Sequence, residues 1–208
     1  MFQAAAARIR EQHAELSALD SACGDGDHGT TMLRIADQLA VAVPVEESAG
    51  FASIFRDTGW KILGVDGGAS SSLIGTFFLG MADAAAATGP MDCRTLAAVL
   101  EAGLEALSKR TSARPGDKTL MDALGPAIAA VRAAAAAGKS TSEALDNAAR
   151  AARAGAESTI GLTARFGRAK FLGDKTRGHR DPGATSIALL FEGFAAAAAS
   201  SKGGAGNA

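Results

Sequence analysis

The chain has 208 residues, enough for one large domain or two small ones, and its 21 lysines and arginines balance 22 aspartates and glutamates. This balance argues against a protein that binds nucleic acid through a basic surface. No apolar run approaches the ~20 residues of a membrane span, and the charged N-terminal segment is unlike a secretory leader. The two cysteines, Cys23 and Cys93, lack the spacing of a metal or redox pair. We therefore predict free thiols in a cytoplasmic protein without a membrane or nucleic-acid partner.

The composition indicates an all-α fold. Alanine dominates, tyrosine is absent, and few stretches alternate polar and apolar residues as a half-buried strand would. Alanine has the highest helix propensity and lets helix axes approach closely, which predicts a tightly packed bundle. No linker divides the chain, so we expect one domain over residues 1–200, followed by a disordered tail at 201–208.

Eight helical segments are predicted from hydrophobic periodicity and capping residues. The aromatic side chains of Trp60, Phe77 and Phe78 are assigned to the core. In chain order the segments cover residues 3–19, 29–41, 48–63 with Ser48 as cap, 67–85, a stretch after the cap Asp92, a stretch from Leu120, a stretch opened by the capping box of Ser140 and Glu143, and a stretch from Pro182 capped by Asp181.

The first connection is acidic. The segment LDSACGDGDHGTTM, residues 19–32, brings together Asp20, Asp25 and Asp27 among glycines. Three like charges repel one another, whereas carboxylates on a flexible loop are oxygen ligands for a hard divalent cation. Magnesium uses few protein carboxylates and completes its shell with water and phosphate oxygens. The alternative is that these aspartates only form turns and helix caps.

Three further connections are rich in glycine or charge. They are GVDGGASSS at 64–72, TSARPGDKT at 111–119 and the long basic segment GLTARFGRAKFLGDKTRGHRDPG at 161–183. In an up-and-down bundle these alternate connections emerge at one end together with the acidic loop. Each one precedes a helix N-terminus, where unpaired N–H groups and the helix dipole favour an anion such as phosphate. Carboxylates beside such termini predict a magnesium–nucleotide site.

Individual residues in these connections allow more than one interpretation. GGASSS lacks the Gly-Lys-Ser/Thr end of a Walker A loop, so Ser70 either contributes to a phosphate cradle or belongs to a plain helix cap. Arg168 either neutralises phosphate charge through paired donors or is a solvated surface arginine. His28 is a candidate acid or base, or a residue at a helix start that bonds a phosphate or the backbone.

Four blocks of this sequence resemble one known family. LDSACGDGDHGTTM, GGASSSLIGTFF, PGDKTLMDAL and GRAKFLGDKTRGHRDPGATS are similar, in this order, to the nucleotide-binding (L) subunit of dihydroxyacetone kinase. The same unit forms the C-terminal domain of single-chain kinases of this family, and the similarity covers essentially the whole chain. The resemblance implies a barrel of eight antiparallel helices with the nucleotide bound in the loops at one end.

The resemblance also implies a set of site residues. Two Mg²⁺ ions would be held by Asp20, Asp25 and Asp27, which together with Arg168 would serve catalysis. Leu120 would touch the adenine, where other members often carry methionine of similar volume. The predicted contacts of ADP or ATP are His28, Gly29, Thr30, Thr31, Ala69, Ser70, Thr111, Leu120, Arg168, Asp181, Pro182 and Gly183. Two departures from the family are Ser71 and Ser72 in place of Gly-Pro, and Thr111 where some relatives have glycine.

The function implied by the resemblance is phosphoryl transfer to a short ketose held on a separate substrate-binding (K) subunit, so the chain would be active only with that partner. The family uses either ATP as a co-substrate or a bound ADP that a phosphoprotein of the phosphotransferase system rephosphorylates. Two alternatives are a kinase for a related ketose such as erythrulose and a non-catalytic nucleotide-binding regulatory module.

Overall fold

The computed structural model describes residues 1–42, 50–85 and 91–203. Within these ranges the chain folds into eight α-helices and two 3₁₀ segments without a β-strand, so the predicted all-α class is confirmed. The elements are α1 (Phe2–Cys23), α2 (His28–Ala40), α3 (Phe51–Leu63), α4 (Gly68–Ala85), α5 (Cys93–Ser108), α6 (Met121–Ala136), α7 (Thr141–Ser158), η1 (Thr159–Gly161), η2 (Arg168–Thr176) and α8 (Pro182–Gly203).

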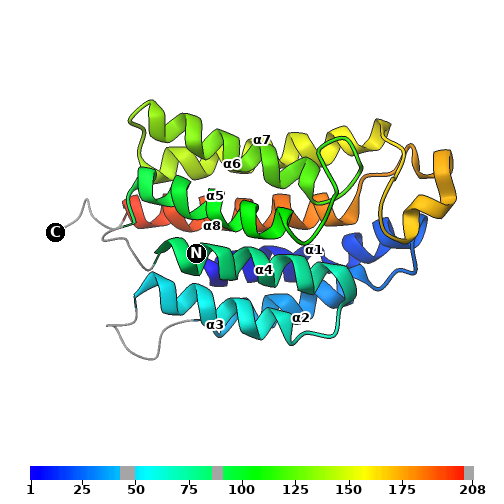
Figure 1. Ribbon diagram of the computed structural model, residues 1–208, viewed down its shortest axis with the longest axis horizontal. Helices are drawn as coiled ribbons and strands as arrows, with labels where there is room; N and C mark the ends of the chain where they lie inside the picture. The colour runs from blue at the N-terminus through cyan, green and yellow to red at the C-terminus, as the bar shows by residue number, and fades with distance from the viewer. Residues whose placement is uncertain (43–49, 86–90, 204–208) are drawn as a thin grey trace.

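The helices form a closed barrel (Figure 1). Each helix packs against the next one along the chain, and α8 returns to pack against α1. A Cβ atom on Gly193 of α8 would lie only 2.3 Å from the Cα of Ala5 in α1, so the absence of a side chain permits this approach. Closure between the first and last helices therefore depends on small residues.

The interior combines large apolar side chains with many alanines. Phe77 and Phe78 of α4 are buried, as predicted, and Phe191 of α8 joins them in the core. Alanine Cβ atoms fill the space where helices lie closest, which agrees with the tight packing expected from composition. Fully buried alanines include Ala5, Ala6, Ala36, Ala82, Ala123, Ala127, Ala144, Ala148, Ala152, Ala156, Ala184 and Ala188.

The prediction that Trp60 belongs to the core is wrong. Trp60 is 62% exposed, whereas Thr58 and Ile62, two positions before and after it on α3, are fully buried. Residues two apart in a helix do not share a face, so the side that buries these two neighbours turns the indole outward.

Helix α8 differs from the prediction that the chain has no apolar run as long as a membrane span. Its segment Pro182–Ser200 has 19 residues and a mean hydropathy of 1.3, which meets the length and composition of a membrane span. The prediction that no such run exists was therefore wrong, because the small alanines were undervalued as apolar residues. This segment is 56% buried inside the barrel and packs against α1 and α7, as a core helix does.

Most predicted helix ends are close to the observed ones. Asp92 caps α5 by accepting a hydrogen bond from the Thr95 N–H at 2.7 Å, and Ser140 and Glu143 form the predicted capping box on α7. Helix α3 instead begins after Gly50, and the predicted cap Ser48 lies outside the described residues. Helix α8 continues to Gly203, past the predicted domain end at residue 200, and residues 204–208 of the predicted tail also lie outside the described part.

The four unusual connections meet at one end of the barrel. Those joining α1 to α2, α3 to α4, α5 to α6 and α7 to α8 all lie toward the right-hand end in Figure 1 and line one cavity. The alternation of helix direction explains this, because every second connection returns to the same end.

Candidate functional site

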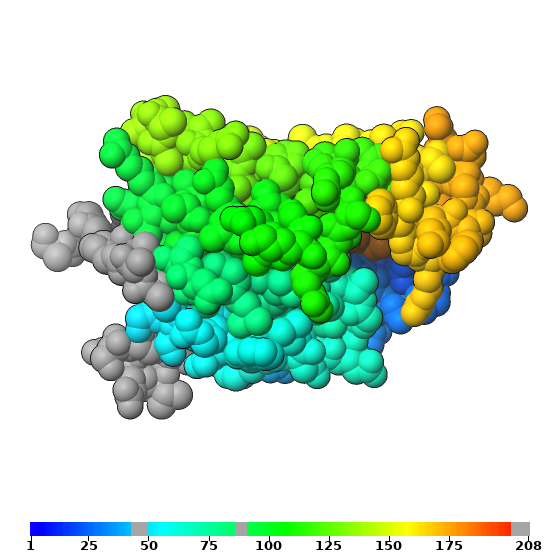
Figure 2. All heavy atoms as spheres, in the orientation of Figure 1, coloured from blue at the N-terminus to red at the C-terminus, as the bar shows by residue number. Residues whose placement is uncertain are grey.

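A cavity of about 730 Å³ opens between the four connections. In Figure 2 the surface is hollowed where the gold 160–181 segment overhangs the blue α1–α2 region. The first turns of α2, α4, α6 and α8 all supply lining residues, so the positive ends of four helix dipoles lie around one space. Such a space suits an anion.

Most of the predicted site residues come together here. Gly29 and Ser70 are exceptions, because neither is part of the cavity lining. The predicted residues that line the cavity are Asp20, Asp25, Asp27, His28, Thr30, Thr31, Ala69, Thr111, Leu120, Arg168, Asp181, Pro182 and Gly183.

Three carboxylates form an acidic cluster on one wall. Asp20, Asp25 and Asp27 each offer an oxygen, and these oxygens lie within 4.8 Å of one another. Asp20 is in the last turn of α1, where its Oδ2 accepts a hydrogen bond from the His28 N–H at 3.2 Å. Gly26 has φ +79°, which turns the loop so that the other two aspartates follow on the same side. Oxygen donors at this density fit a hard divalent cation.

Arg168 provides the counter-charge to this cluster. Its guanidinium forms an ion pair with Asp25, and its Nη1 lies 3.7 Å from Oδ2 of Asp27. Arg168 begins η2, which packs against α1, so the basic segment reaches back across the mouth of the cavity to the acidic loop. Arg168 thus lies at the cavity beside the carboxylates, and its side chain is 66% exposed. Its role toward a phosphate stays a prediction.

The ring of His28 connects its own helix α2 to α8 and to α4. It is only 8% exposed, and its Nε2 lies 2.7 Å from the Ser186 hydroxyl while its Nδ1 lies 3.3 Å from the Ser70 hydroxyl. The Ser186 hydroxyl donates to the Pro182 carbonyl at 3.0 Å, so it accepts from Nε2–H and leaves Nδ1 to accept from Ser70. Burial lowers the pKa of His28, which favours this neutral ring.

Gly29 serves the scaffold beside the site. A Cβ atom at this position would lie 2.1 Å from the carbonyl oxygen of His13 and 2.3 Å from the Ser17 hydroxyl. Only a glycine lets α2 approach α1 so closely at the end that carries the aspartates. The packing therefore accounts for this glycine independently of a ligand.

Asp181, which is partly buried, and Lys118, which is buried, form a polar wall of the cavity. The Oδ2 of Asp181 accepts from the Ala184 N–H at 2.6 Å, which confirms its role as the cap of α8. Burial raises the pKa of Asp181 to about 7, against the opposing effects of the Ala184 N–H and the Lys118 charge. Lys118 is only 3% exposed, and burial lowers the pKa of its ammonium group.

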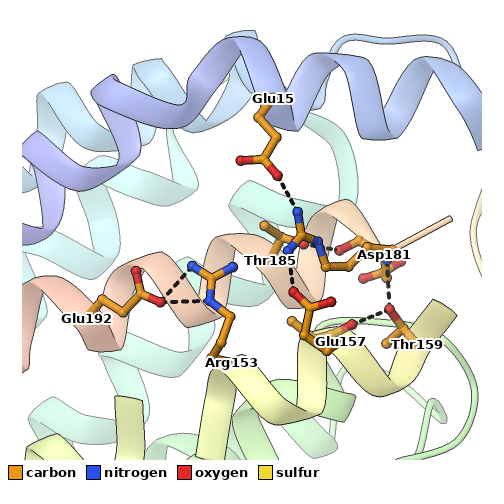
Figure 3. Close-up of polar contacts among 9 residues, drawn as sticks. Glu15, Arg153, Glu157, Thr159, Asp181, Thr185 and Glu192 are labelled. Carbon is orange, nitrogen blue, oxygen red and sulfur yellow. Dashed lines mark hydrogen bonds and ion pairs between the residues drawn. The ribbon is translucent and has the colours of Figure 1, made fainter. Parts of the chain in front are cut away.

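Arg180 fixes the start of α8 between two other helices. It pairs with Glu15 of α1 and Glu157 of α7. Both glutamates are labelled in Figure 3. Among the described buried side-chain nitrogens and oxygens, its Nε is the one without a partner. One turn further along the barrel, Arg153 Nη2 lies 2.6 Å from Glu192 Oε1 and ties α7 to α8. The end of the basic segment is therefore held rigidly at the cavity wall.

Several lining residues were missed from the sequence. Lys118 and Arg180 line the cavity and belong to the motifs PGDKT and GHRDPG. Their place in these motifs could have indicated that they lie at the site. Arg34 lies one turn beyond Thr31, and its Nη1 donates to the Asp66 carbonyl at 2.7 Å, which ties α2 to the loop before α4. The partner of His28 on α8 had no local signal, because 158 residues separate it from that histidine.

The fold and the site together define a class of protein: a closed barrel of helices with carboxylates and helix N-termini around one polar cavity. The model of the DAK2 domain matches residues 22–196. The chain is 36% identical over 183 residues to the PEP-dependent dihydroxyacetone kinase, ADP-binding subunit DhaL, of Escherichia coli (strain K12), covering 88% of this chain and 87% of that protein. The identity to ADP-binding subunit DhaL of kinase 1 from Listeria innocua is 38%, with the same shares covered. The chain belongs to the DAK2 domain family.

A solved structure supports the same assignment. The dihydroxyacetone kinase from C. freundii, determined in complex with AMP-PNP and Mg²⁺, superposes with a TM-score of 0.74 at 28% identity. The match covers 94% of this chain but only 33% of that longer protein. The barrel described here thus corresponds to one part of that kinase, as the resemblance implied.

Proposed function

We propose that this chain is the magnesium- and nucleotide-binding subunit of a dihydroxyacetone-type kinase, which transfers a phosphoryl group to a short ketose held on a separate subunit. The observation that carries the proposal is the meeting of three carboxylates and four helix N-termini around one cavity. The names of the bacterial relatives, which are ADP-binding subunits of dihydroxyacetone kinases, support it.

The donor set fits magnesium. Asp20, Asp25 and Asp27 supply only oxygen atoms, which a hard cation prefers. One Mg²⁺ is usually bound by one or two carboxylates together with phosphate oxygens, so three carboxylates within 4.8 Å support two ions. Bound magnesium would neutralise charge on the phosphates during transfer.

The chain's own residues would orient the nucleotide. The starts of α2 and α4 line the cavity through Thr30 and Ala69, where backbone N–H groups would bind the phosphates. Leu120 offers an apolar contact for the base from the start of α6. Arg168 is close enough to the carboxylates to accompany a phosphate bound there, where its paired N–H donors would stabilise the developing charge. No residue of this chain needs to be covalently modified.

The partner would dock at the cavity mouth. Phe171 is 81% exposed and Leu172 is 42% exposed, and they lie on η2 three and four residues after Arg168. A large apolar pair next to a polar site is typical of a surface that a protein partner covers. A substrate-binding subunit seated here would bring its ketose to the cavity that holds the nucleotide. The two free, buried cysteines agree with the reducing environment of the cytoplasm, where we place the complex.

Reconstitution tests this function. The purified chain is combined with a substrate-binding subunit of this kinase type, and ketose phosphate is measured with dihydroxyacetone and with erythrulose. We expect transfer to dihydroxyacetone; preference for erythrulose would favour the related kinase. Tight magnesium–nucleotide binding without transfer to either ketose would favour the regulatory module.

The phosphoryl donor is tested separately. Radiolabelled ADP that stays with the chain through gel filtration and many turnovers would identify a coenzyme recharged by a phosphoprotein of the phosphotransferase system. Rapid exchange with ATP would identify a co-substrate.

A further inference from the structure

Lys118 has an unusual backbone and an unusual environment. Its φ is +60°, and it is the non-glycine residue with positive φ in the described part of the chain. Left-handed backbone costs a non-glycine residue roughly 1–2 kcal/mol. Lysine is also rarely buried, yet this side chain is 3% exposed. Two unfavourable features at one residue indicate a contact that compensates for them.

The ammonium group of Lys118 supplies that contact. Its Nζ donates to the carbonyl oxygen of Thr159 at 2.5 Å and to the carbonyl oxygen of His179. These carbonyls stand at the two ends of the segment that joins α7 to α8. Two further hydrogen bonds close the same ends. The Gly178 N–H donates to the Ile160 carbonyl at 2.9 Å. The Asp181 N–H donates to the Thr159 hydroxyl at 2.8 Å, a bond that Figure 3 shows.

The segment between these ends, residues 160–178, carries the residues that complete the site. Gly167, Arg168 and Ala169 line the cavity, while Phe171 is almost fully exposed. Most of residues 165–175 have little buried surface, so the core contributes little to their position. Besides the packing of η2 on α1 and the bond from the Arg165 N–H to the Asp117 carbonyl, the place of Arg168 therefore depends on how the two ends of the segment are held.

We propose that Lys118 is a positioning residue that clasps both ends of the 160–178 segment and thereby sets Arg168 over the acidic cluster. The charge-assisted bonds from one buried ammonium to two carbonyls are stronger than neutral ones. The clasp rests on contacts within this chain, whereas its effect on turnover rests on the proposed kinase function.

Limited trypsin digestion tests whether Lys118 holds the 160–178 segment in place, because the trypsin sites Arg165, Lys170 and Lys175 lie within it. The variants are Lys118→Met, which keeps most of the side-chain volume, and Lys118→Gly, which also relieves the left-handed backbone. We expect both to keep wild-type helicity and to be cleaved within the segment about tenfold faster, as the loss of charge-assisted hydrogen bonds predicts.

Lys118→Arg, which keeps donors and charge, should recover most of the protection from cleavage. The matched control is Lys109→Met, at an exposed lysine in the same connection, and it should be cleaved at the wild-type rate.

In the reconstituted kinase we expect the Met and Gly variants to lower kcat by about 10- to 100-fold with a smaller change in KM, because a displaced Arg168 affects the transferring group most. Wild-type cleavage rates in both variants would overturn the clasp. Loss of helicity in both would overturn it as well, because Lys118 would then belong to the scaffold of the whole barrel. Faster cleavage with unchanged kcat would uphold the clasp and contradict only its link to the proposed function.

Discussion

Arg168 and Asp25 form an ion pair that joins the basic segment before α8 to the acidic loop after α1. The positive guanidinium of Arg168 thus lies beside the acidic cluster, where it partly neutralises the negative charge. Both side chains are about half exposed or more, at 66% and 47%, so the pair itself contributes at most about 1 kcal/mol to the free energy of unfolding. Its importance lies in placing the group that we propose to bind phosphate beside the carboxylates.

Arg168→Gln is expected to weaken the binding of Mg–ADP by about 10- to 100-fold, because charge-assisted bonds to phosphate are lost. Calorimetric titration measures this effect. The control is Arg177→Gln, at an arginine of similar exposure that pairs with Asp174 in the same segment. Equal affinities of the two variants would remove Arg168 from the nucleotide site.

Asp25→Asn and Asp27→Asn are each expected to abolish magnesium-dependent nucleotide binding while circular dichroism stays unchanged. The neutral amide keeps the shape of the side chain but is a much weaker ligand for magnesium. Without metal, the melting temperature should stay equal or rise, since repulsion among carboxylates is relieved. Asp83→Asn, at an exposed carboxylate on α4, should bind as the wild type does. A site variant that keeps its affinity would exclude that aspartate as a ligand.

The carboxyl of Asp181 should make the free energy of unfolding depend on pH in the metal-free, nucleotide-free chain. The folded protein retains this proton up to about pH 7, whereas the unfolded chain releases it near 3.8. The free energy of unfolding therefore falls as pH rises between these values, by at most about 4 kcal/mol, and the loss is complete above them.

The substitution Asp181→Asn keeps a good helix cap but removes the titration, so it should flatten this pH dependence. Chemical denaturation of both proteins between pH 4 and 8 measures the difference. Parallel curves for wild type and variant would show that the carboxyl of Asp181 is not responsible.

Gly29→Ala should destabilise the barrel by about 1–3 kcal/mol or more, because its Cβ would collide with the His13 carbonyl of α1. Urea unfolding measures the change. Gly161→Ala is the control, since no atom lies within 4 Å of a Cβ built there. Similar stabilities of the two variants would contradict the close contact between α1 and α2.

The docking surface is tested by Phe171→Ser combined with Leu172→Ser. We expect this double variant to keep the wild-type affinity for Mg–ADP but to lose association with the substrate-binding subunit by at least about 10-fold, because exposed apolar anchors dominate interfaces. Trp60→Ser removes an exposed aromatic from the side of the barrel and should associate normally. Normal association of the double variant, measured by sedimentation, would place the interface elsewhere.

Local patterns predicted much of the barrel and its site. The three aspartates lie close together because eight residues of sequence contain them, and the four loops share one end because helices alternate in direction. The family resemblance added residues such as Thr30 and Leu120, whose types alone indicate no ligand. Their roles in nucleotide binding stay predictions, although both line the cavity.

Tertiary relationships were beyond the sequence patterns. Lys118 was missed because lysine is normally exposed, and only the carbonyls of Thr159 and His179 explain its burial. Trp60 was misplaced because its size favoured the core, while the face of α3 turned it outward. The role of Ser70 depends on the buried ring of His28, which no local motif specifies.

The packing of α8 onto α1 also has a consequence for biosynthesis. The ribosome releases Asp20, Asp25 and Asp27 well before Arg168, because Arg168 lies far downstream of them in the sequence. A nascent polypeptide therefore carries the acidic half of the site without its basic half. Products truncated before α8 would lack one of the four helix starts that line the cavity, so they would be unable to assemble the whole site.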